Sequence, residues 1–501
     1  DRQGHLPLYM QIAAQMRALM AAGTLNVGDR LPPHRDLAET LGVNRSTVMT
    51  AYDELLADGL IGGRVGSGTY VIARPAPVAQ PAETKDANTP TSLNWDALLP
   101  EMCADEWLAQ RGGATGRDEI LFTQALPNAA QFPLDAFRRA VERVMRREGR
   151  TLLQLGTSRG YEPLQEYLLG QAALAGINAT ADEMLITSGC QQALDMLRQI
   201  LLQPGDEVAM ENPTFPGAIS VFCQPPYQPI SVPVGAHGLD LDALESVLRQ
   251  RRPKLIYLVP TFHNPTGVTM DLAARRRMLA LAAQYRTPIV EDEIYRDLRY
   301  EGAAQPSLKS LDTYGVVIYV NSFSKVSFPG LRVGWIIGPR RVIEHLHTLK
   351  QRAELHGNLL SQAAMCDFAR QGELARHLQR CRRGYTQKRD TMLAALEKHF
   401  PAGTQWTRPE GGLAIWIRMP DELDAGRLLT QAREQQVSFT PGARFYVSGA
   451  QAATLRLSFS LASPAQIEEG VRRLGELANT QLAQAKRNPA VRRATGVTAL
   501  V

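Results

Sequence analysis

Beyond residue 118, short apolar runs alternate with longer stretches of helical spacing, and this alternation constrains the fold more than any other feature. The runs lie at residues 184–187, 207–210, 255–259, 288–290 and 316–320. Alternating strands and helices favour a mostly parallel sheet that is covered by helices. Ligands of such sheets bind beside the carboxyl ends of the strands. We therefore predict an α/β domain over residues 118–480, with a binding site at that edge of its sheet.

Composition adds three limits. With 501 residues, 44% hydrophobic and 21% charged, the chain is long enough for two or three globular domains. No apolar run approaches the roughly 20 residues that cross a bilayer, so we expect no association with a membrane. The five cysteines are scattered and form no Cys-x-x-Cys pair. Their distribution argues against a disulfide scaffold or a metal site and favours a reducing, cytoplasmic compartment.

The first 73 residues form a second predicted unit. Apolar residues at helical spacing indicate helices at residues 8–22, 34–41 and 45–58. Gly42 fits the position that ends a helix and Asn44 fits an N-cap, so a short turn joins the last two helices, as in a helix-turn-helix. Two short strands around a glycine-rich turn follow within residues 60–72. Residues 1–73 are therefore predicted to form an α+β winged helix-turn-helix domain.

Residues 74–117 are expected to join the two units. From Ala73 to Pro90 the chain is rich in proline, alanine and polar residues without periodicity, which is typical of a semi-rigid linker. At the other end, residues 481–501 are predicted to form a basic, flexible tail. The formal net charge of +5 is too small to indicate nucleic-acid binding, so a DNA contact depends on where individual arginines lie.

The run from Asn321 to Arg332 carries the strongest chemical signal. In it Lys325 is flanked by serines and is followed by Pro-Gly and then by Arg332. A lysine amine forms a Schiff base with an aldehyde once it has lost its proton, which burial beside other cations favours. The guanidinium fork of Arg332 and the hydroxyl of Ser322 suit a phosphate. This run therefore predicts a site for an aldehyde cofactor that carries a phosphate.

Further candidates follow the predicted strands. Ser188, Gly189 and Cys190 open a helix, and free amides at a helix N-terminus favour a phosphate. Each of the other signals is weak by itself, and a core phenylalanine explains Phe215 better when it is taken alone. The remaining candidates are Phe215, which can stack on a ring, Asn264 and Tyr295, which can bond a phenolic oxygen, and Asp292, which can pair with a pyridinium nitrogen.

The N-terminal unit resembles the winged helix of the GntR regulators. The resemblance is carried by Leu31-Pro32, Arg35, Leu37-Ala38, Leu41-Gly-Val43 and Arg45-Ser-Thr47-Val48. It implies binding to double-stranded DNA. Arg45, Ser46 and Thr47 are expected to enter the major groove, where arginine reads guanine. Arg35 and Arg64 are expected to hold phosphates, although a solvated surface charge explains any single arginine equally well.

The candidates of the large unit have the order and spacing that resemble the fold-type I, class I and II aminotransferases. The resemblance implies a domain that binds pyridoxal 5'-phosphate, in which Lys325 forms the Schiff base and Asp292 pairs with the ring nitrogen as the catalytic residues. It also implies that Arg456 clamps the carboxylate of an amino-acid-like effector. The other implied cofactor contacts are Asn264 and Tyr295 at the ring oxygen, Phe215 on the ring, and Ser188, Gly189, Cys190, Ser322 and Arg332 at the phosphate.

A GntR winged helix joined to an aminotransferase-like domain resembles the MocR subfamily of transcriptional regulators. The resemblance implies a homodimer that binds DNA and senses pyridoxal phosphate, or an amino-acid-type effector, through Lys325. A working aminotransferase that carries a DNA-binding module is the alternative, because the residues that transamination needs are all present. A DNA-binding protein with an inactive scaffold is a third possibility. Two positions depart from the aminotransferase pattern, since Ala125 replaces a glycine and Gln165 replaces an arginine.

Overall fold

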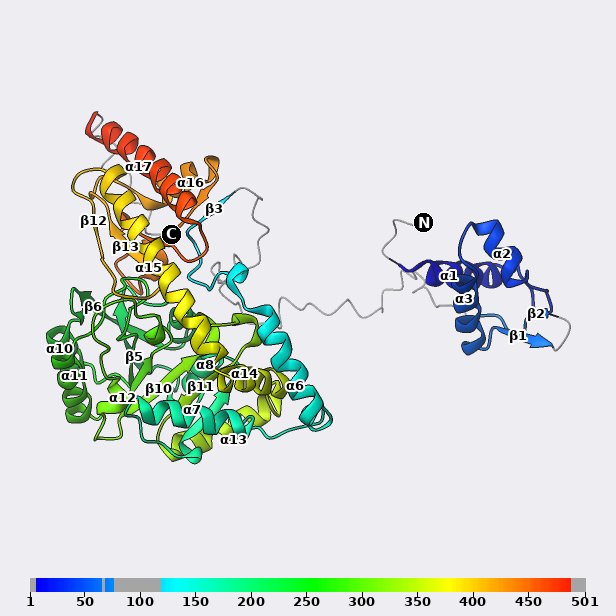
Figure 1. Ribbon diagram of the computed structural model, residues 1–501, viewed down its shortest axis with the longest axis horizontal. Helices are drawn as coiled ribbons and strands as arrows, with labels where there is room; N and C mark the ends of the chain where they lie inside the picture. The colour runs from blue at the N-terminus through cyan, green and yellow to red at the C-terminus, as the bar shows by residue number, and fades with distance from the viewer. Residues whose placement is uncertain (1–5, 65–67, 76–118, 488–501) are drawn as a thin grey trace, which may run out of the picture. The chain divides into compact units, whose positions relative to one another are not determined.

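The computed structural model describes residues 6–64, 68–75 and 119–487, which belong to two compact units (Figure 1). Each unit is described by itself. The expected linker, residues 74–117, and the distal part of the expected tail lie almost entirely outside the described residues. Within the described ranges, no helix is long and apolar enough to cross a membrane.

The N-terminal unit contains the expected three helices and two strands. These are α1 (Leu8–Ala21), α2 (His34–Leu41), α3 (Arg45–Ala57), β1 (Ile61–Arg64) and β2 (Gly68–Val71), with the two strands antiparallel. Gly42 ends α2 at φ 62°, a left-handed conformation that favours glycine. Asn44 stands at the N-cap of α3, but its side chain makes no capping hydrogen bond. Tyr52 ties α3 to the segment before α2 by donating to the carbonyl of Pro32 at 2.8 Å.

An apolar core holds this small unit together. An ion pair between Arg17 of α1 and Asp58 adds to it at the end of α3. Because these two side chains are partly exposed, we expect the pair to contribute less than about 1 kcal/mol. The buried core side chains include Ile12, Met16, Met20, Leu31, Val48, Tyr52, Leu55, Ile61 and Val71.

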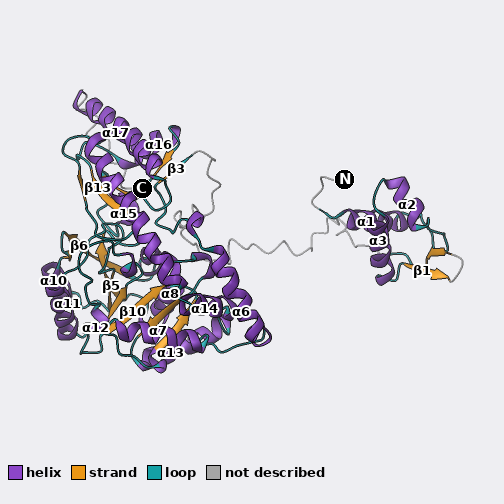
Figure 2. Ribbon diagram, viewed as in Figure 1, coloured by secondary structure: helices purple, strands orange, loops and turns teal. Residues whose placement is uncertain are grey.

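A mixed sheet of eight strands forms the centre of the large unit (Figures 1 and 2). Its order is β4-β11-β10-β9-β8-β5-β6-β7, and the strands from β10 to β6 are parallel. β11 is antiparallel to both of its neighbours, so β4 runs in the same direction as β10. The strands are β4 (Met184–Thr187), β5 (Glu207–Asn212), β6 (Gln228–Gly235), β7 (Gly238–Leu239), β8 (Leu255–Leu258), β9 (Ile289–Asp292), β10 (Val317–Ser322) and β11 (Gly334–Ile337).

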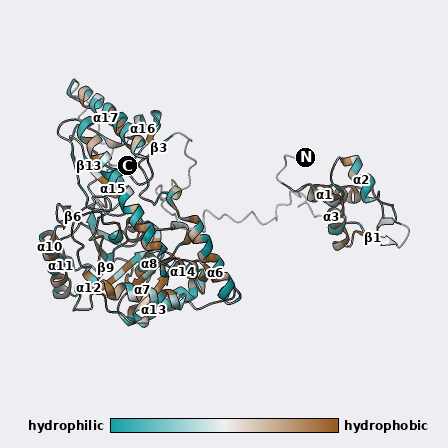
Figure 3. Ribbon diagram, viewed as in Figure 1, coloured by the Kyte–Doolittle hydropathy of each residue, from teal (hydrophilic) through white to brown (hydrophobic). Residues whose placement is uncertain are grey.

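Helices cover both faces of this sheet, which explains why its central strands read as continuous apolar runs. On β8, Ile256 and Leu258 pack in the core beneath α10 and α11, while Leu255 and Tyr257 belong to the core on the opposite face. The helices carry alternating hydrophobic and hydrophilic stripes (Figure 3). They are α6 (Leu134–Leu152), α7 (Glu162–Leu174), α8 (Cys190–Leu201), α9 (Pro216–Phe222), α10 (Leu241–Gln250), α11 (Leu272–Tyr285), α12 (Leu308–Leu311), α13 (Arg340–Glu354) and α14 (Leu359–Arg370).

A second sheet, which the apolar runs do not predict, follows in the C-terminal part. Its four strands are β12 (Gln405–Trp406), β13 (Ala414–Arg418), β16 (Thr454–Ser458) and β15 (Thr440–Pro441), in that order. A separate parallel pair joins β3 (Ile120–Leu121) to β14 (Val437–Ser438) and so ties the start of the unit to this region. The helices here are α15 (Glu373–His399), α16 (Ala425–Glu434) and α17 (Pro464–Arg487).

The last helix extends beyond residue 480, where the sequence places the end of the domain. α17 continues to Arg487, and Gln481 is buried and donates to the side-chain oxygen of Gln431 at 2.8 Å. The first part of the expected tail is therefore helical because its side chains still pack on the domain.

Candidate cofactor site and DNA-binding surface

Lys325 lies where the sheet leads one to expect a ligand, directly after the carboxyl end of β10. It ends a short 3-10 helix, η5 (Phe323–Lys325), and is half-buried. Its Nζ donates to the carbonyl of Ala125 at 2.8 Å and lies 5.7 Å from the centre of the Tyr295 ring. The amine is thus held in a defined place, bonded to the backbone of Ala125 and close to the candidate ring contact Tyr295.

Asp292 is the last residue of β9 and is 2% exposed. Its carboxylate accepts from the hydroxyl of Tyr257 at 3.1 Å and from the backbone N–H of Ile294 at 3.3 Å. Burial raises the pKa of Asp292 to about 6, while the Tyr257 hydroxyl acts in the opposite direction. At neutral pH the group is a buried anion, which suits a protonated ring nitrogen.

A cradle for an anion forms between β4, the start of α8 and Arg332. Gly189 caps α8 at φ 83°, and a Cβ at this position would overlap the guanidinium of Arg332. Arg332 donates to the carbonyl of Ser188 at 2.9 Å and makes a longer contact, 3.4 Å, with the hydroxyl of Ser324. Free amides at a helix N-terminus beside a guanidinium are well suited to phosphate.

Cys190 begins α8 and Ser322 ends β10, and a hydrogen bond joins their side chains. Burial raises the pKa of the Cys190 thiol well above its usual range, so the thiol stays neutral. A hydrogen bond with Ser322 acts in the opposite direction and lowers this pKa. The charges of Asp292, Lys325 and Arg332 also affect the pKa of Cys190. These candidate residues thus follow or end β4, β9 and β10, and Arg332 precedes β11.

Arg456 is buried in the middle of β16, in the second sheet. Its Nη1 donates to the side-chain oxygen of Asn264 at 2.9 Å, and its Nη2 donates to the carbonyl of Thr123. Its Nε has no hydrogen-bond partner among the described residues. Burial lowers the pKa of Arg456 to about 10, so the guanidinium remains charged at neutral pH. A buried cation with an unused donor fits a carboxylate ligand.

The structure brings Asn264 and Tyr295 together as well, because both line one narrow cavity with Ala125. Phe215 caps the start of α9, and its ring packs against Gly217, which has no room for a side chain. The ring also lies beside Gln191 in the first turn of α8. Phe215 thus lies next to the first turn of α8, the helix that begins at the cradle.

These residues fit pyridoxal phosphate. At the cradle the guanidinium of Arg332 offers a positive charge to a phosphate beside the start of α8, Asp292 offers a buried anion for the ring nitrogen, and Lys325 offers an amine. When bound, this cofactor takes up electrons from bonds to the carbon that carries the ligand's amino group. The residues themselves bind, orient and exclude water.

Three consecutive carbonyls are held by donors of this site. Thr123 accepts from Arg456, Gln124 accepts from Ser458 of the same strand at 2.9 Å, and Ala125 accepts from Lys325. The residue that replaces a family glycine, Ala125, is therefore bonded through its backbone to the lysine. These contacts could not be predicted from the sequence, because every residue has a backbone carbonyl and its side chain does not indicate which carbonyl is used.

Tyr257 is a second contact that sequence reasoning missed. A signal was present, since a tyrosine in an otherwise apolar, fully buried strand needs a hydrogen-bond partner for its hydroxyl. Glu354 was missed too; its carboxylate lies 3.5 Å from the hydroxyl of Ser188 and 3.4 Å from the amine of Lys350.

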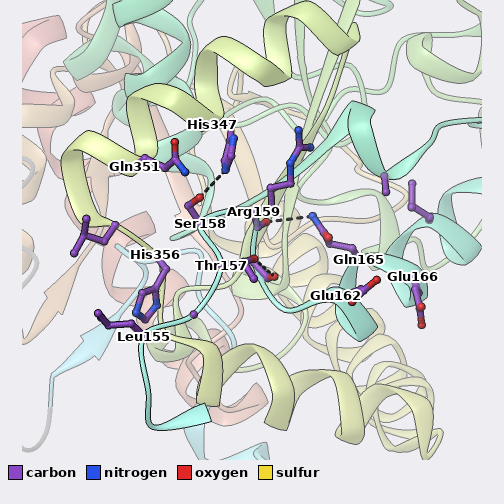
Figure 4. A pocket seen from close by; sticks show the side chains of 15 residues that line it. Leu155, Thr157, Ser158, Arg159, Glu162, Gln165, Glu166, His347, Gln351 and His356 are labelled. Atoms are coloured by element: carbon purple, nitrogen blue, oxygen red, sulfur yellow. Dashed lines mark hydrogen bonds between the residues drawn. The ribbon is translucent and has the colours of Figure 1, made fainter. Parts of the chain in front are cut away.

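A larger hollow lies away from Lys325, between α7, α13 and residues 155–160. Its volume is about 1040 Å³ (Figure 4). Ser158 and His347 are hydrogen-bonded on one side of it, and Gln165 donates to the carbonyl of Arg159 at 3.2 Å on another. Gln165, which replaces a family arginine, therefore belongs to this hollow rather than to the cofactor site.

In the N-terminal unit, the residues predicted to contact DNA lie on α2, α3 and β1. Arg45 and Ser46 form the first turn of α3 and are exposed, whereas Thr47 is half-buried. Arg35 is exposed on α2. Arg64 ends β1; its side chain and the turn at residues 65–67 lie outside what the structure describes. The helix that would enter a groove thus presents its N-terminal end to solvent.

Comparisons with known proteins support the family predicted for each of the two domains. The family model described as "Aminotransferase class I and II" matches residues 124–474, and "Bacterial regulatory proteins, gntR family" matches residues 8–71. The chain belongs to the class I and II aminotransferase family. Its first domain is a GntR-type DNA-binding domain, as in the MocR regulators. The aminotransferase family depends on pyridoxal phosphate, which confirms the expected cofactor class.

Individual relatives resemble either the whole chain or its large unit. A probable rhizopine catabolism regulatory protein, MocR, of Rhizobium meliloti is 31% identical over 95% of this chain and 94% of its own. A 2-aminoadipate transaminase of Thermus thermophilus is 39% identical over 72% of this chain and 90% of its own. The structure of LysN, an α-aminoadipate aminotransferase of Thermus thermophilus complexed with N-(5'-phosphopyridoxyl)-L-leucine, has a TM-score of 0.71, is 36% identical and covers 78% of this chain and 100% of its own.

Proposed function

We propose that this protein is a cytoplasmic transcription regulator whose large domain senses pyridoxal phosphate, an amino-acid-type effector, or both, through Lys325. The observation that carries the proposal is the presence, in one chain, of an α3 with an exposed N-terminal end and of residues around Lys325 that suit the cofactor. The effector is an amine with a carboxylate, because Lys325 suits the first group and Arg456 the second. Binding of this ligand to the large domain changes the relative populations of conformations that differ in their affinity for DNA.

The direct test is a titration of the purified protein against its own upstream promoter DNA. The DNA affinity is measured by fluorescence anisotropy at fixed salt, with and without pyridoxal phosphate and then with individual amino acids. A sensor changes its DNA affinity by about 5- to 150-fold on ligand binding, and DNA changes the ligand affinity by the same factor. Lys325→Ala should abolish this change. A ligand effect that survives in Lys325→Ala would support the inactive-scaffold alternative instead.

An active aminotransferase that carries a DNA-binding domain is the second candidate. The buried Asp292 and the cationic Arg456 favour it as much as they favour a sensor. The two are separated by adding an amino acid to the protein loaded with cofactor and following keto-acid product over many turnovers. Sustained turnover at ordinary enzymatic rates, roughly 1–1000 per second, would show that the protein is an aminotransferase and not a sensor.

The protein is proposed to act as a homodimer, and the large hollow supports this. Leu155 and Leu355, which are 79% and 64% exposed, line the hollow beside its polar groups. Large exposed apolar side chains around a concave surface are typical of an interaction site. A second copy of this chain is the expected occupant, because fold-type I sites are normally built at a dimer interface.

The same surface is connected to the cofactor site by hydrogen bonds. The buried amine of Lys350 donates to the carbonyl of Ser158 in the hollow and pairs with Glu354, whose carboxylate contacts Ser188 in the cradle. Association of two copies at the hollow would therefore act on α13, whose last residue, Glu354, contacts Ser188 in the cradle. We expect cofactor binding and self-association to strengthen each other.

A further inference from the structure

The hydroxyl of Tyr257 meets Asp292 from the neighbouring strand. Tyr257 is the third residue of β8, and β8 runs parallel to β9, which ends at Asp292. Tyr257 is fully buried, and its hydroxyl lies 3.1 Å from Oδ2 of Asp292. No sequence motif marks this tyrosine, and it is separate from Tyr295, which is predicted to contact the ring oxygen.

The direction of this hydrogen bond is fixed. Burial raises the pKa of Tyr257 well above its usual range, and the negative charges of Asp292 and Glu211 raise it further. The hydroxyl therefore keeps its proton and can only donate when Asp292 is ionised. A donor to the charged form of a carboxylate stabilises that form.

The other groups around Asp292 do not replace this donor. The charge of Glu293 opposes ionisation of Asp292, and Lys325 favours it. Cys190 also lies within electrostatic range, but it is neutral. Besides Tyr257, the hydrogen-bond donor that favours ionised Asp292 is the backbone N–H of Ile294. Tyr257 is thus the side chain that offsets the burial of the carboxylate through a direct hydrogen bond.

We propose that Tyr257 is a positioning residue for the cofactor: by donating to Asp292, it keeps this carboxylate ionised and oriented for the ring nitrogen. The inference rests on the proposed pyridoxal phosphate site. Without the hydroxyl, Asp292 takes up a proton at a higher pH, and a neutral carboxyl group pairs poorly with a protonated ring. The cofactor is then bound more weakly near neutral pH.

The test uses the full-length protein and Tyr257→Phe, which keeps the ring and its contact with Phe222. The Kd for pyridoxal phosphate is measured by absorption titration from pH 5 to pH 9. Because the pKa of Asp292 is about 6, wild-type affinity should be constant above that pH and fall below it. In Tyr257→Phe the fall should begin at a higher pH, with affinity at pH 7 reduced about tenfold and affinity at pH 9 close to wild type.

Tyr319→Phe is the matched control. Tyr319 is a buried tyrosine on the adjacent β10, and its hydroxyl accepts from Asn321 rather than donating to Asp292. It should leave the pH at which affinity falls unchanged. An equal shift in both variants, or no shift in Tyr257→Phe, would overturn the inference. In an Asp292→Asn background, Tyr257→Phe should have little further effect on the pH profile.

Two further results separate the possible failures. If wild-type protein binds no pyridoxal phosphate, the proposed function fails. If wild-type protein binds it and Tyr257→Phe has the same profile, only the role of Tyr257 fails. Should Tyr257→Phe not fold, 3-fluorotyrosine placed at position 257 tests the same point in the opposite direction. This stronger donor should move the fall in affinity to a lower pH, and an unchanged profile would overturn the inference.

Discussion

Arg456 and Asn264 are hydrogen-bonded to each other, from Nη1 to Oδ1 at 2.9 Å, although the sequence assigns them to different ligand groups. The guanidinium predicted to hold an effector carboxylate is thus oriented by the amide predicted to contact the ring oxygen. Both side chains are buried, so the bond is little weakened by solvent. Contact with one part of a ligand should therefore depend on contact with the other.

Replacing Arg456 should weaken binding of amino acids more than binding of amines. Arg456→Gln removes a charged donor, and we expect a 10- to 100-fold loss of affinity for an amino acid, which corresponds to about 1.5–3 kcal/mol. Affinity for the matching amine without a carboxylate should fall much less, through the lost contact between Arg456 and Asn264 alone. Both affinities are measured by calorimetry on protein loaded with cofactor. Arg418→Gln, at an exposed position of the adjacent β13, is the control and should change neither value.

Adding a methyl group at Gly189 should displace Arg332 and reduce cofactor affinity. Gly189→Ala introduces a Cβ that overlaps the guanidinium, in a backbone conformation with φ 83°. Gly205→Ala provides the control, because its φ of 89° imposes similar backbone strain but no atom lies within 4 Å of its Cβ. Both variants should lose about 1 kcal/mol of stability. Only Gly189→Ala should weaken pyridoxal phosphate binding, and equal weakening in both would contradict the predicted cradle.

Removing the side chain of Arg45 should weaken DNA binding and relax specificity by about 1–3 kcal/mol. The comparison is with Arg17→Ala, which breaks the ion pair with Asp58 inside the same unit. Arg17→Ala should lower thermal stability slightly and leave operator affinity unchanged. Anisotropy titrations with operator and scrambled DNA measure both terms. Unchanged operator affinity in Arg45→Ala would exclude the predicted contact with a base.

A carboxylate introduced into the large hollow should dissociate the proposed dimer. Leu155→Glu places a carboxylate at a position that is 79% exposed and lines the hollow. Leu174→Glu, at the end of α7, is 84% exposed but does not line it. Analytical ultracentrifugation should show monomers for the first variant and dimers for the second. A dimer that persists in Leu155→Glu would place self-association on another surface.

The sequence predicts the strands that matter for the site because buried parallel strands read as apolar runs. β8, β9 and β10 lie within two residues of the expected ranges; Asp292 is the last residue of β9, and Lys325 lies three residues after β10. β11 was not predicted, since Gly334 and Trp335 make half of it atypical of a buried apolar run, and it runs antiparallel. The assigned roles of the cofactor and DNA contacts remain predictions.

Other parts of the site could not be predicted because they join residues far apart in the chain. Tyr257 and Asp292 are on different strands, and only the register of β8 against β9 brings them together. The second sheet was missed because two of its strands contain only two residues each. Arg456 lies on that sheet, and its expected role came from family resemblance rather than from an apolar pattern.

Residues 123–125, whose three carbonyls accept from the ligand site, are among the first described residues of the large unit and follow β3 closely. A ligand that takes the amine of Lys325 removes the donor of Ala125. Thr123, in contrast, has a second donor, the hydroxyl of Thr440 at 3.1 Å, and stays paired if Arg456 turns to the ligand. Each buried carbonyl left unpaired costs about 1–3 kcal/mol. We therefore expect a ligand at Lys325 to release the backbone of Ala125, so that the segment after β3 is held less tightly when the site is occupied.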